Sequence, residues 1–581
     1  MIVKNPFRRV EPNEGDCYPM DIPNLRWWGW GTLDQDYSLE GRTAFWPTLQ
    51  EWLELPEQAI QHPVPPVSLK DISLRPPRLD GPVLSSLRRL LGEETVHTDQ
   101  QARVEHAYGK SYRDLVRVRA GYIPNPPDAV VYPADQGQVV SLLAWAADRD
   151  VAIIPFGGGS TVLGGVEPEP GDTPVITLDL ARLDRVLSVD PISRTACIQA
   201  GATGPEVETQ LNAQGFTLGH FPQSFEFSTL GGWIATRSAG QNSVGYGKIE
   251  HMTQAVRVVT PVGIIETKDT PATAAGPSLL ELLIGSEGTY GVITVATMRI
   301  HPLPAVQDYR GILFHNLDDS ITAYRDLLQS PGLHPSITRL SDAPEAAAFT
   351  VMSHEHHGLR RLADDLIEQY LKMRKYDLTT GSTLMLLGFD GEAEWTARQW
   401  DQALEICSDH RGLLVGQSVG RSWVRDRYAQ PYLRDTLLGH GVMVDTLETA
   451  TTWSNLIHLY EAMASAMKGA IAATGGGPGY VMTHVSHAYE YGASLYSTFL
   501  GRQVPDPDPL ARQAQWQFVK QATTEAILAA GGTLTHHHGI GRDHAPWLEE
   551  EVGLLGMKAL RALKPVFDPT GIMNLGILLP A

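Results

Sequence analysis

The sequence has few cysteines, a deficit of basic residues and no long apolar run. Its three cysteines, Cys17, Cys197 and Cys407, show no paired spacing, which argues against a disulfide framework or a cysteine-based zinc site and favours a reducing compartment. No apolar run approaches the roughly 18 residues of a transmembrane helix, and the N-terminus lacks a signal-peptide core. The C-terminal Leu-Leu-Pro-Ala is not a peroxisomal signal. We therefore expect a cytoplasmic protein, with peripheral contact at a membrane surface left open.

The net charge limits the binding partners that can be expected, and the length indicates how many domains to expect. A formal net charge of −20 argues against nucleic acid or an anionic membrane as a general partner, although a local basic pocket can still hold a phosphate. At 581 residues the chain is too long for one hydrophobic core, so two or three domains are expected.

Residues 1–120 are rich in proline and tryptophan, and we expect them to form an N-terminal arm and helices. Trp27, Trp28 and Trp30 lie close together in this region. Large amphipathic rings in such a cluster favour packing of the arm onto the body of the protein, and insertion into a membrane interface is the alternative.

From residue 128 the sequence changes to short runs rich in Val, Ile and Thr, alternating with amphipathic segments. This pattern predicts an α+β domain over residues 121–303. We expect strands at 129–133, 151–155, 175–179, 185–189 and 195–199, a strand pair around 261–263, a strand at 291–300 closed by Pro302, and helices at 136–148 and 206–214.

Longer helical patterns then alternate with short strands. Helices at 320–328, 359–374 and 394–410 and a strand at 383–389 predict a cap domain over 304–525, with an antiparallel sheet flanked by helices. A long helix at 511–530 leads into a C-terminal segment, 526–581, which we expect to return to the cofactor.

A run of three glycines follows the predicted strand at 151–155. In Pro155–Thr161 the glycines let successive backbone N–H groups point into one hollow, a nest for a diphosphate, while Ser160 and Thr161 can add hydroxyl donors. The alternative is a flexible surface turn. The third glycine of a dinucleotide GxGxxG motif would fall at Val162, and no GxxxxGK[ST] motif exists, so NAD and P-loop chemistry are disfavoured.

Two further glycine-rich stretches, residues 223–240 and 285–293, place small and hydroxyl residues where backbone must approach a planar ligand. The order PFGGGS, EFSTLGGWIATR, GSEGTYGVIT is similar to the FAD domain of the vanillyl-alcohol-oxidase/PCMH superfamily. The resemblance implies that the first loop cradles the pyrophosphate, that the second stretch lines the flavin and phosphates, and that 287–293 holds the adenosine. His220 lies near the second stretch but offers no convincing attachment site, so noncovalent FAD is expected.

The residues that the resemblance implies for FAD binding are Pro155, Phe156, Gly157, Gly158, Gly159, Ser160, Thr161, Gln223, Ser224, Phe225, Glu226, Phe227, Ser228, Thr229, Thr236, Arg237, Ser238, Ala239, Glu287, Gly288, Thr289, Tyr290, Gly291, Val292 and Ile293.

Most of the chain resembles the alkyldihydroxyacetonephosphate synthase (alkylglycerone-phosphate synthase) family. The likeness lies in Trp28–Gly31, Tyr432–Asp435, Tyr489–Tyr496 and Thr535–Gly541 and is weak between 304 and 420. It implies an FAD-dependent exchange of the acyl group of acyl-dihydroxyacetone phosphate for a fatty alcohol in ether-lipid synthesis, through an adduct at flavin N5. It also implies a homodimer.

Such a reaction needs a base, and imidazole has a pKa near working pH. His536, His537 and His538 offer this group, and we assign the base to His537. Adjacent strand residues point to opposite faces, so the three cannot share one role, and a structural hydrogen bond is the alternative for each. The resemblance makes Tyr496 a proton donor or acceptor, the alternative being a packed tyrosine. Arg434 would hold a phosphate or carboxylate, the alternative being an ion pair with Asp435.

Several features leave other functions open. Related FAD-dependent 2-hydroxy-acid dehydrogenases carry a metal-binding Glu where this chain has His537, and their HxGDGNxH motif is missing around His484. An oxidase or dehydrogenase of a hydroxy acid or alcohol is therefore the alternative, and a flavin-bound protein without turnover is a third. Ala272 stands where the animal enzymes have an arginine, which puts the anion site in doubt. The run Ser353–His357 is not HExxH, and a solvated helix end is expected there, so no metal is predicted.

Overall fold

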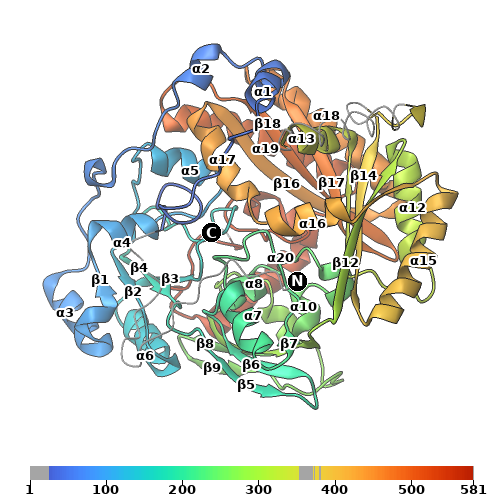
Figure 1. Cartoon of the computed structure of the whole chain (residues 1–581). Coiled ribbons are helices and arrows are strands. Elements are labelled where there is room, and N and C mark those ends of the chain that lie inside the picture. The colour runs from blue at the N-terminus through green and yellow to red at the C-terminus, as the bar shows by residue number, and fades with distance from the viewer. Residues whose placement is uncertain (1–24, 353–370, 372, 378–380, 580–581) are drawn as a thin grey trace.

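The structure is a computed structural model that describes residues 25–352, 371, 373–377 and 381–579 (Figure 1). The run at 353–357 lies outside the described residues, as does the predicted helix at 359–374 apart from residues 371, 373 and 374. Among the described residues, none of the helices combines the length and apolar character that crossing a bilayer requires.

The first sheet positions the glycine loop, which follows directly after strand β3. Its order is β1–β2–β4–β3, with β2, β4 and β3 parallel and β1 antiparallel. Strands β2 and β4 are buried along their whole length, as expected for parallel strands covered on both faces. Helix α6 begins after Asp135, whose carboxylate accepts the Gln138 N–H at 2.9 Å. The elements are β1 (Val96–His97), β2 (Ala129–Val131), α6 (Gln136–Ala147), β3 (Ala152–Phe156) and β4 (Val175–Asp179).

The second sheet is antiparallel, with the order β5–β6–β10–β8–β9. It shares one hydrophobic core with the first sheet, so the two form a single packed unit. Strand β10 ends at Arg299 and does not run on to Pro302, which instead pairs with Phe216 in a two-residue ladder. The elements are β5 (Val186–Asp190), β6 (Thr195–Gln199), α7 (Gly204–Asn212), β7 (Phe216–Thr217), α8 (Leu230–Ala235), β8 (Thr253–Thr260), β9 (Gly263–Glu266), β10 (Val292–Arg299) and β11 (His301–Pro302).

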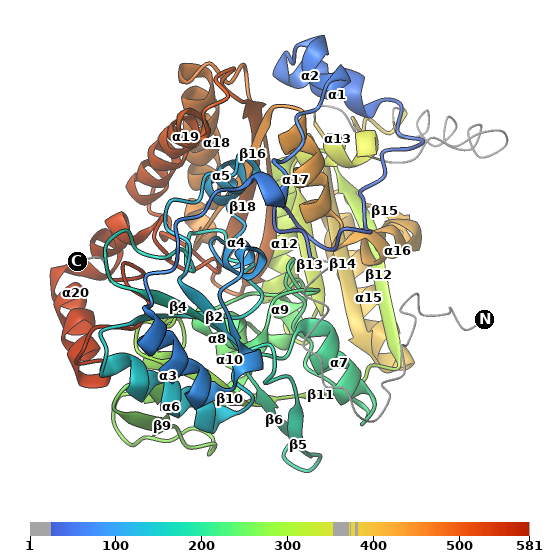
Figure 2. The ribbon, with the colours of Figure 1, turned by 90° about the vertical axis from the view of Figure 1, so that its left-hand side faces the viewer.

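A large antiparallel sheet, with the order β15–β12–β14–β13–β17–β18–β16, fills the upper right of Figure 1. Helices α12, α15, α18 and α19 pack on it in one hydrophobic core, which confirms the predicted antiparallel sheet flanked by helices (Figure 2). The strands are β12 (Val306–Phe314), β13 (Ile337–Ser341), β14 (Thr383–Gly391), β15 (Leu413–Gly416), β16 (Val442–Thr452), β17 (Tyr480–Tyr489) and β18 (Gly492–Arg502). The helices are α12 (Leu317–Gln329), α15 (Ala393–Asp409), α18 (Leu456–Ala473) and α19 (Pro509–Ala529).

The large sheet packs one face on the hydrophobic core and turns the other toward a cavity. In β16, Met443 and Leu447 belong to the core, whereas Val444, Asp445 and Thr446 line a cavity beside the glycine-rich loops. Because successive side chains of a strand point to opposite faces, one face of this sheet is available to hold polar residues against the glycine-rich loops.

The N-terminal arm packs onto the body through its tryptophans, which confirms the packing prediction. Trp30 is buried and contacts the ring of Phe227 edge-on, with ring centres 5.3 Å apart. Its backbone N–H donates to Asp435 at 2.6 Å. Trp27 packs against the large-sheet core, and Trp28 lies under the guanidinium of Arg26.

The C-terminal end of the chain returns to the first sheet. Met573 pairs in parallel with Ile153 of β3 beside the glycine loop. Helix α20 (Leu548–Phe567) precedes this contact and lies beside the first two sheets (Figure 2).

Candidate active site

A cavity of about 380 Å³ lies where the three glycine-rich stretches meet the polar face of the large sheet. It brings together most residues predicted to bind a cofactor with three of the four predicted catalytic residues. The predicted residues that line it are Pro155, Phe156, Gly157, Gly158, Gly159, Ser160, Thr161, Gln223, Ser224, Ser228, Thr229, Thr236, Ser238, Ala239, Glu287, Gly288, Gly291, Val292, Ile293, Arg434, Tyr496, His537 and His538.

The glycines of the first loop lie against neighbouring backbone and side chains that leave no room for a Cβ. A Cβ on Gly158 would lie 1.7 Å from the Phe227 carbonyl oxygen, and one on Gly157 would lie 2.2 Å from the Thr229 hydroxyl. Gly159 has a φ of 59°, in the region that favours glycine. The loop is thus a tightly packed cradle that lines the cavity, and the surface-turn alternative does not describe it.

The Gly158→Ala variant is expected to be recovered without bound FAD. The added methyl must displace the Phe227 carbonyl and with it the loop that closes the cradle. Absorbance near the flavin maximum of the purified protein measures this. Gly469→Ala in α18 is the matched control, because a Cβ there meets nothing within 4 Å. A yellow Gly158→Ala protein with wild-type flavin content would contradict the assignment of the cradle.

Three predicted residues of the second stretch lie behind the cavity. Phe225 stacks on Tyr428, with ring centres 5.2 Å apart. The Glu226 carboxylate accepts the Tyr432 hydroxyl at 3.3 Å. Phe227 presents its carbonyl to Gly158 and its ring to Trp30. These residues support the loop, and the structure does not bring their side chains into the cavity lining.

Three others also lie away from it. The Arg237 side chain is 40% exposed and pairs with Glu281 at 3.3 Å. Thr289 and Tyr290 are buried and donate to the carbonyls of Ile577 and Leu560. These two hold the C-terminal segment against the third glycine-rich stretch. His220, also buried, lies 3.2 Å from the Ser238 hydroxyl and is not among the lining residues.

The cavity wall holds buried polar atoms that no other described protein atom satisfies. Unpaired atoms in a closed protein are costly, so a polar ligand that reaches them would be favoured. They are Gln241 Oε1, Arg339 Nε, Arg434 Nε, Ser486 Oγ, His487 Nδ1 and Asn574 Oδ1. Together with the glycine cradle, this donor and acceptor set fits a dinucleotide that carries both a diphosphate and a polar ring.

The histidine triplet is held by one buried carboxylate, Glu448 on β16. Its oxygens accept the backbone N–H groups of His536, His537 and His538 at 2.6, 3.2 and 3.0 Å, and the Thr535 hydroxyl as well. Three successive N–H groups converge on one anion, which fixes the backbone of the triplet. Sequence reasoning missed Glu448, because 88 residues separate it from His536.

The three imidazoles point in different directions. His537 lies face to face with Tyr496 at 5.8 Å between ring centres, and His538 meets the same ring edge-on at 5.5 Å. His536 does not line the main cavity; its Nε2 lies 2.7 Å from the Tyr489 hydroxyl. His537 and His538 are therefore the members of the triplet that face a ligand, and His536 lies behind them.

The protonation of the triplet follows from its burial. Burial lowers the pKa of all three imidazoles, to about 3 for His536 and well below the usual value for His537. Burial opposes ionisation of Glu448, but the facing imidazoles and the Thr535 hydroxyl hold its pKa well below the usual value. The imidazoles are therefore neutral near neutral pH, each with a free nitrogen lone pair, and the lowered pKa means that a proton taken up there is released readily.

Tyr496 joins a second polar cluster on the large sheet. Its ring stacks on His484, with centres 4.9 Å apart, and its hydroxyl donates to Thr446 at 3.2 Å. His484 Nδ1 lies 2.8 Å from Glu345, which also pairs with Arg339 at 2.9 Å. Burial raises the pKa of Tyr496 to about 12, so the phenol is a proton donor near neutral pH.

Two cations reach the same cavity. Arg434 donates to the Lys110 carbonyl at 2.7 Å. Asp435, its alternative partner, instead accepts from Trp30 and lies 3.8 Å from Arg26. Burial lowers the pKa of the Lys110 ammonium to about 8, which leaves it mostly charged at pH 7. Lys110 was not predicted from the sequence, and Ala272 lies on an exposed turn outside the cavity lining.

A second buried carboxylate, Glu287, anchors the other end of the histidine segment. It accepts the N–H groups of Ile540 and Gly541 at 2.6 and 2.7 Å. Asn574 donates to the Glu287 carbonyl at 2.6 Å. Burial raises the pKa of Glu287 to about 7. The segment is thus fixed between Glu448 of the large sheet and Glu287 of the FAD-binding domain.

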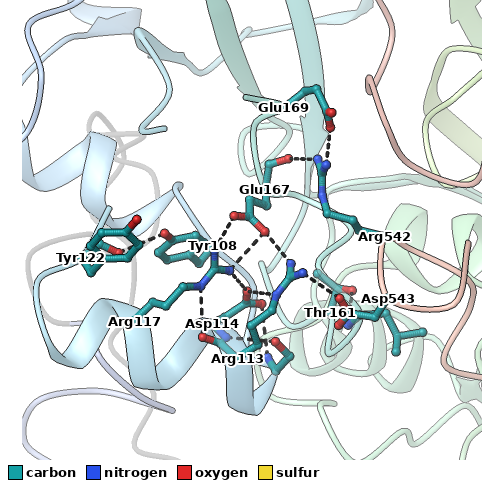
Figure 3. A network of polar contacts seen from close by, with 12 residues as sticks. Tyr108, Arg113, Asp114, Arg117, Tyr122, Thr161, Glu167, Glu169, Arg542 and Asp543 are labelled. Atoms are coloured by element: carbon teal, nitrogen blue, oxygen red, sulfur yellow. Dashed lines mark hydrogen bonds and ion pairs between the residues drawn. The ribbon is translucent and has the colours of Figure 1, made fainter. Parts of the chain in front are cut away.

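An ion-pair network fixes the residues that follow the triplet. Figure 3 shows Arg113 between Glu167 and Asp543, at 2.5 and 2.9 Å. Arg117 pairs with Glu167 at 2.6 Å, and Arg542 pairs with Glu169. The network ties helix α5 (Tyr112–Arg119), the loop after the glycine cradle and the C-terminal segment together.

Glu448, His536 and His537 offer ligand atoms within 4.8 Å of one another, a spacing that a metal ion could use. Hydrogen bonds already engage these atoms. The Glu448 oxygens accept from residues 535–538, while His536 contacts His537 through Nδ1 and Tyr489 through Nε2. We therefore interpret the cluster as a proton-handling group.

Comparisons with known proteins agree with this geometry. A family model described as an FAD binding domain matches residues 127–268, and one described as the C-terminal domain of FAD linked oxidases matches 303–577. Alkyldihydroxyacetonephosphate synthase from Trypanosoma brucei brucei is 36% identical over 510 residues, 87% of this chain and 82% of the relative. The protein of that name from Dictyostelium discoideum is 35% identical over 518 residues, 89% of this chain and 84% of the relative.

A solved structure of an alkyldihydroxyacetonephosphate synthase has a TM-score of 0.81 and 31% identity, and the match covers 95% of this chain and 98% of that one. A p-cresol methylhydroxylase with bound substrate, with a TM-score of 0.60 and 15% identity, shares the fold alone. These matches confirm the predicted PCMH-type fold and FAD as the cofactor.

Proposed function

Because the chain belongs to the alkyldihydroxyacetonephosphate synthase family, we propose that it exchanges the acyl group of acyl-dihydroxyacetone phosphate for a fatty alcohol in ether-lipid synthesis. The observation that carries the proposal is that His537, His538 and Tyr496 line the same cavity as the glycine cradle. A proton acceptor and a proton donor therefore face the place where FAD binds.

The cations of the cavity suit the phosphate of such a substrate. The Arg434 guanidinium offers a planar set of donors, with Nε unpaired and buried, and the Lys110 ammonium adds a point charge. Holding the phosphate there would orient carbon 1 of the substrate toward the histidines.

The proton steps follow from the protonation states. His537, neutral at working pH, removes a proton from the carbon that bears the ester. Tyr496, protonated below about pH 12, donates a hydrogen bond to the departing carboxylate. When bound, FAD supplies an electrophilic ring that stabilises the reacting carbon, and the net reaction consumes no electrons. A homodimer, which rests on the resemblance alone, completes the proposal. Noncovalent FAD, a cytoplasmic location and peripheral membrane contact also belong to it and rest on the sequence and on the lipid nature of the substrate.

One anaerobic experiment tests the proposal. The purified yellow protein is mixed with acyl-dihydroxyacetone phosphate and, separately, with D-lactate or glycolate, while flavin absorbance and released fatty acid are followed. The synthase is expected to lose flavin absorbance and release fatty acid with the phosphate ester alone. Reduction by the hydroxy acids without response to the ester would establish the dehydrogenase instead, and no response to any ligand would favour a protein without turnover.

A further inference from the structure

A chain of hydrogen bonds crosses the histidine triplet from the active cavity to the opposite side. His537 lines the active cavity, and its Nδ1 lies 3.1 Å from Nδ1 of His536. Nε2 of His536 lies 2.7 Å from the Tyr489 hydroxyl. The function described above uses neither His536 nor Tyr489.

His536 and Tyr489 line a second cavity of about 920 Å³, distinct from the one that holds the glycine cradle. Its wall includes Tyr491, which is 75% exposed and stacks on Tyr489 with ring centres 5.8 Å apart. Glu250 and Lys248, paired at 3.0 Å, also line it. The second cavity therefore opens to solvent and presents polar groups to it.

The reaction proposed above leaves one proton in the active cavity at each turnover. The bond between carbon 1 and the acyl oxygen breaks, a bond from carbon 1 to the alcohol oxygen forms, and the alcohol loses its hydroxyl proton. The fatty acid, with an ordinary carboxyl pKa of about 4 to 5, departs as a carboxylate near neutral pH. The proton removed from carbon 1 returns to it, but the proton of the alcohol must leave the cavity.

We propose that His536 and Tyr489 carry this proton from His537 to the second cavity, an inference that rests on the proposed function. His537 accepts the proton at Nε2 and gives its Nδ1 proton to Nδ1 of His536. His536 then gives its Nε2 proton to the Tyr489 oxygen, while the Tyr489 hydroxyl proton passes to water in the second cavity. No group is oxidised or reduced, and each of the three residues receives one proton as it loses another, so both imidazoles end in the opposite tautomer and return to the first by exchange with water.

The surroundings of His536 allow it to pass a proton on but disfavour a lasting positive charge on its ring. Burial and the Lys248 ammonium, which donates to the His536 carbonyl at 2.7 Å, disfavour a lasting charge on the ring. The groups that face His536 are Lys248, Glu448, His487, Tyr489, His537 and His538.

The Tyr489→Phe variant of the holoenzyme tests the relay. Removing one oxygen interrupts the chain and keeps the ring, so kcat for alkyl transfer is expected to fall about tenfold or more with KM unchanged. Added imidazole, which can enter the second cavity and accept the proton from His536, is expected to restore the rate in a concentration-dependent way. Tyr491→Phe is the matched control, since that ring lines the same cavity without contacting His536, and it should keep wild-type kcat.

Provided that the wild-type enzyme transfers alkyl groups, two results would overturn the relay. One is a wild-type kcat in Tyr489→Phe, and the other is a reduced kcat that added imidazole does not restore. Absence of transfer by the wild-type enzyme would instead overturn the proposed function. Even if the wild-type enzyme shows no transfer, ¹⁵N NMR of the holoenzyme with ¹⁵N-labelled histidine decides whether His537, His536 and Tyr489 form a connected hydrogen-bond path. Loss of the Tyr489 hydroxyl must shift the resonances of both His536 and His537, whereas a shift confined to His536 counts against a connected path.

Discussion

The His537→Ala variant is expected to bind FAD like the wild type and to lose kcat by about 10²- to 10⁴-fold, the usual contribution of a general base. His537 is the triplet member that both lines the cavity and connects to His536. Its backbone N–H donates to Glu448 at 3.2 Å and its ring Nδ1 lies 3.5 Å from the same carboxylate, so removing the ring keeps the backbone hydrogen bonds that anchor the segment. Flavin absorbance measures FAD binding, and the rate of fatty-acid release measures kcat.

His458→Ala, an exposed histidine on α18, is the control for loss of an imidazole as such, and it should keep full activity. Unchanged turnover in His537→Ala would reject the base assignment. Because His538 faces the same tyrosine ring, His538→Ala should be compared in the same assay.

The Glu448→Ala variant is expected to lose both activity and stability. Four donors, from Thr535 to His538, would be left without their buried acceptor. Each buried donor left without an acceptor costs roughly 1–3 kcal/mol of unfolding free energy, so a loss of several kcal/mol is expected. The triplet would also lose its fixed position beside Tyr496, so kcat should fall at least as far as in His537→Ala. Urea denaturation followed by circular dichroism measures the loss of unfolding free energy, and the alkyl-transfer assay measures the loss of kcat.

Glu551→Ala is the matched control for this carboxylate. Glu551 accepts the Thr533 hydroxyl and the Leu534 N–H at 2.6 and 2.9 Å, in the same segment, but it is exposed. Its loss should cost less than about 1 kcal/mol and leave kcat unchanged. Equal effects of the two substitutions would show that burial of Glu448 does not set the position of the triplet.

The sequence predicts those parts of the site in which a few consecutive residues determine the local backbone structure. Three consecutive glycines after a buried strand imply a close-packed loop beside a ligand, and Gly157–Gly159 are close-packed and line the cavity. The short runs rich in Val, Ile and Thr at 175–179 and 195–199 form strands β4 and β6 with those bounds. The prediction at 291–300 overran at its end, because residue 300 leaves the ladder before the two-residue strand that contains Pro302.

The remaining parts depend on which distant residues the fold brings together. Glu448 and Glu345 carry no sequence signature; they become functional because strand register sets Glu448 opposite Tyr496 and places His484 opposite the same tyrosine. Likewise the motif at 223–229 identifies the correct loop but not which side chains face the ligand. A pattern of residue types fixes the path of the backbone more reliably than it fixes the direction of each side chain.

The central claim is that the glycine cradle holds FAD with its ring against His537, His538 and Tyr496. A crystal structure of the FAD-bound protein tests it most directly. We expect the diphosphate on the N–H groups of Gly157–Gly159 and the isoalloxazine ring within about 4 Å of the three side chains. A protein that purifies colourless and takes up no added FAD, or a ring bound away from these side chains, would contradict it.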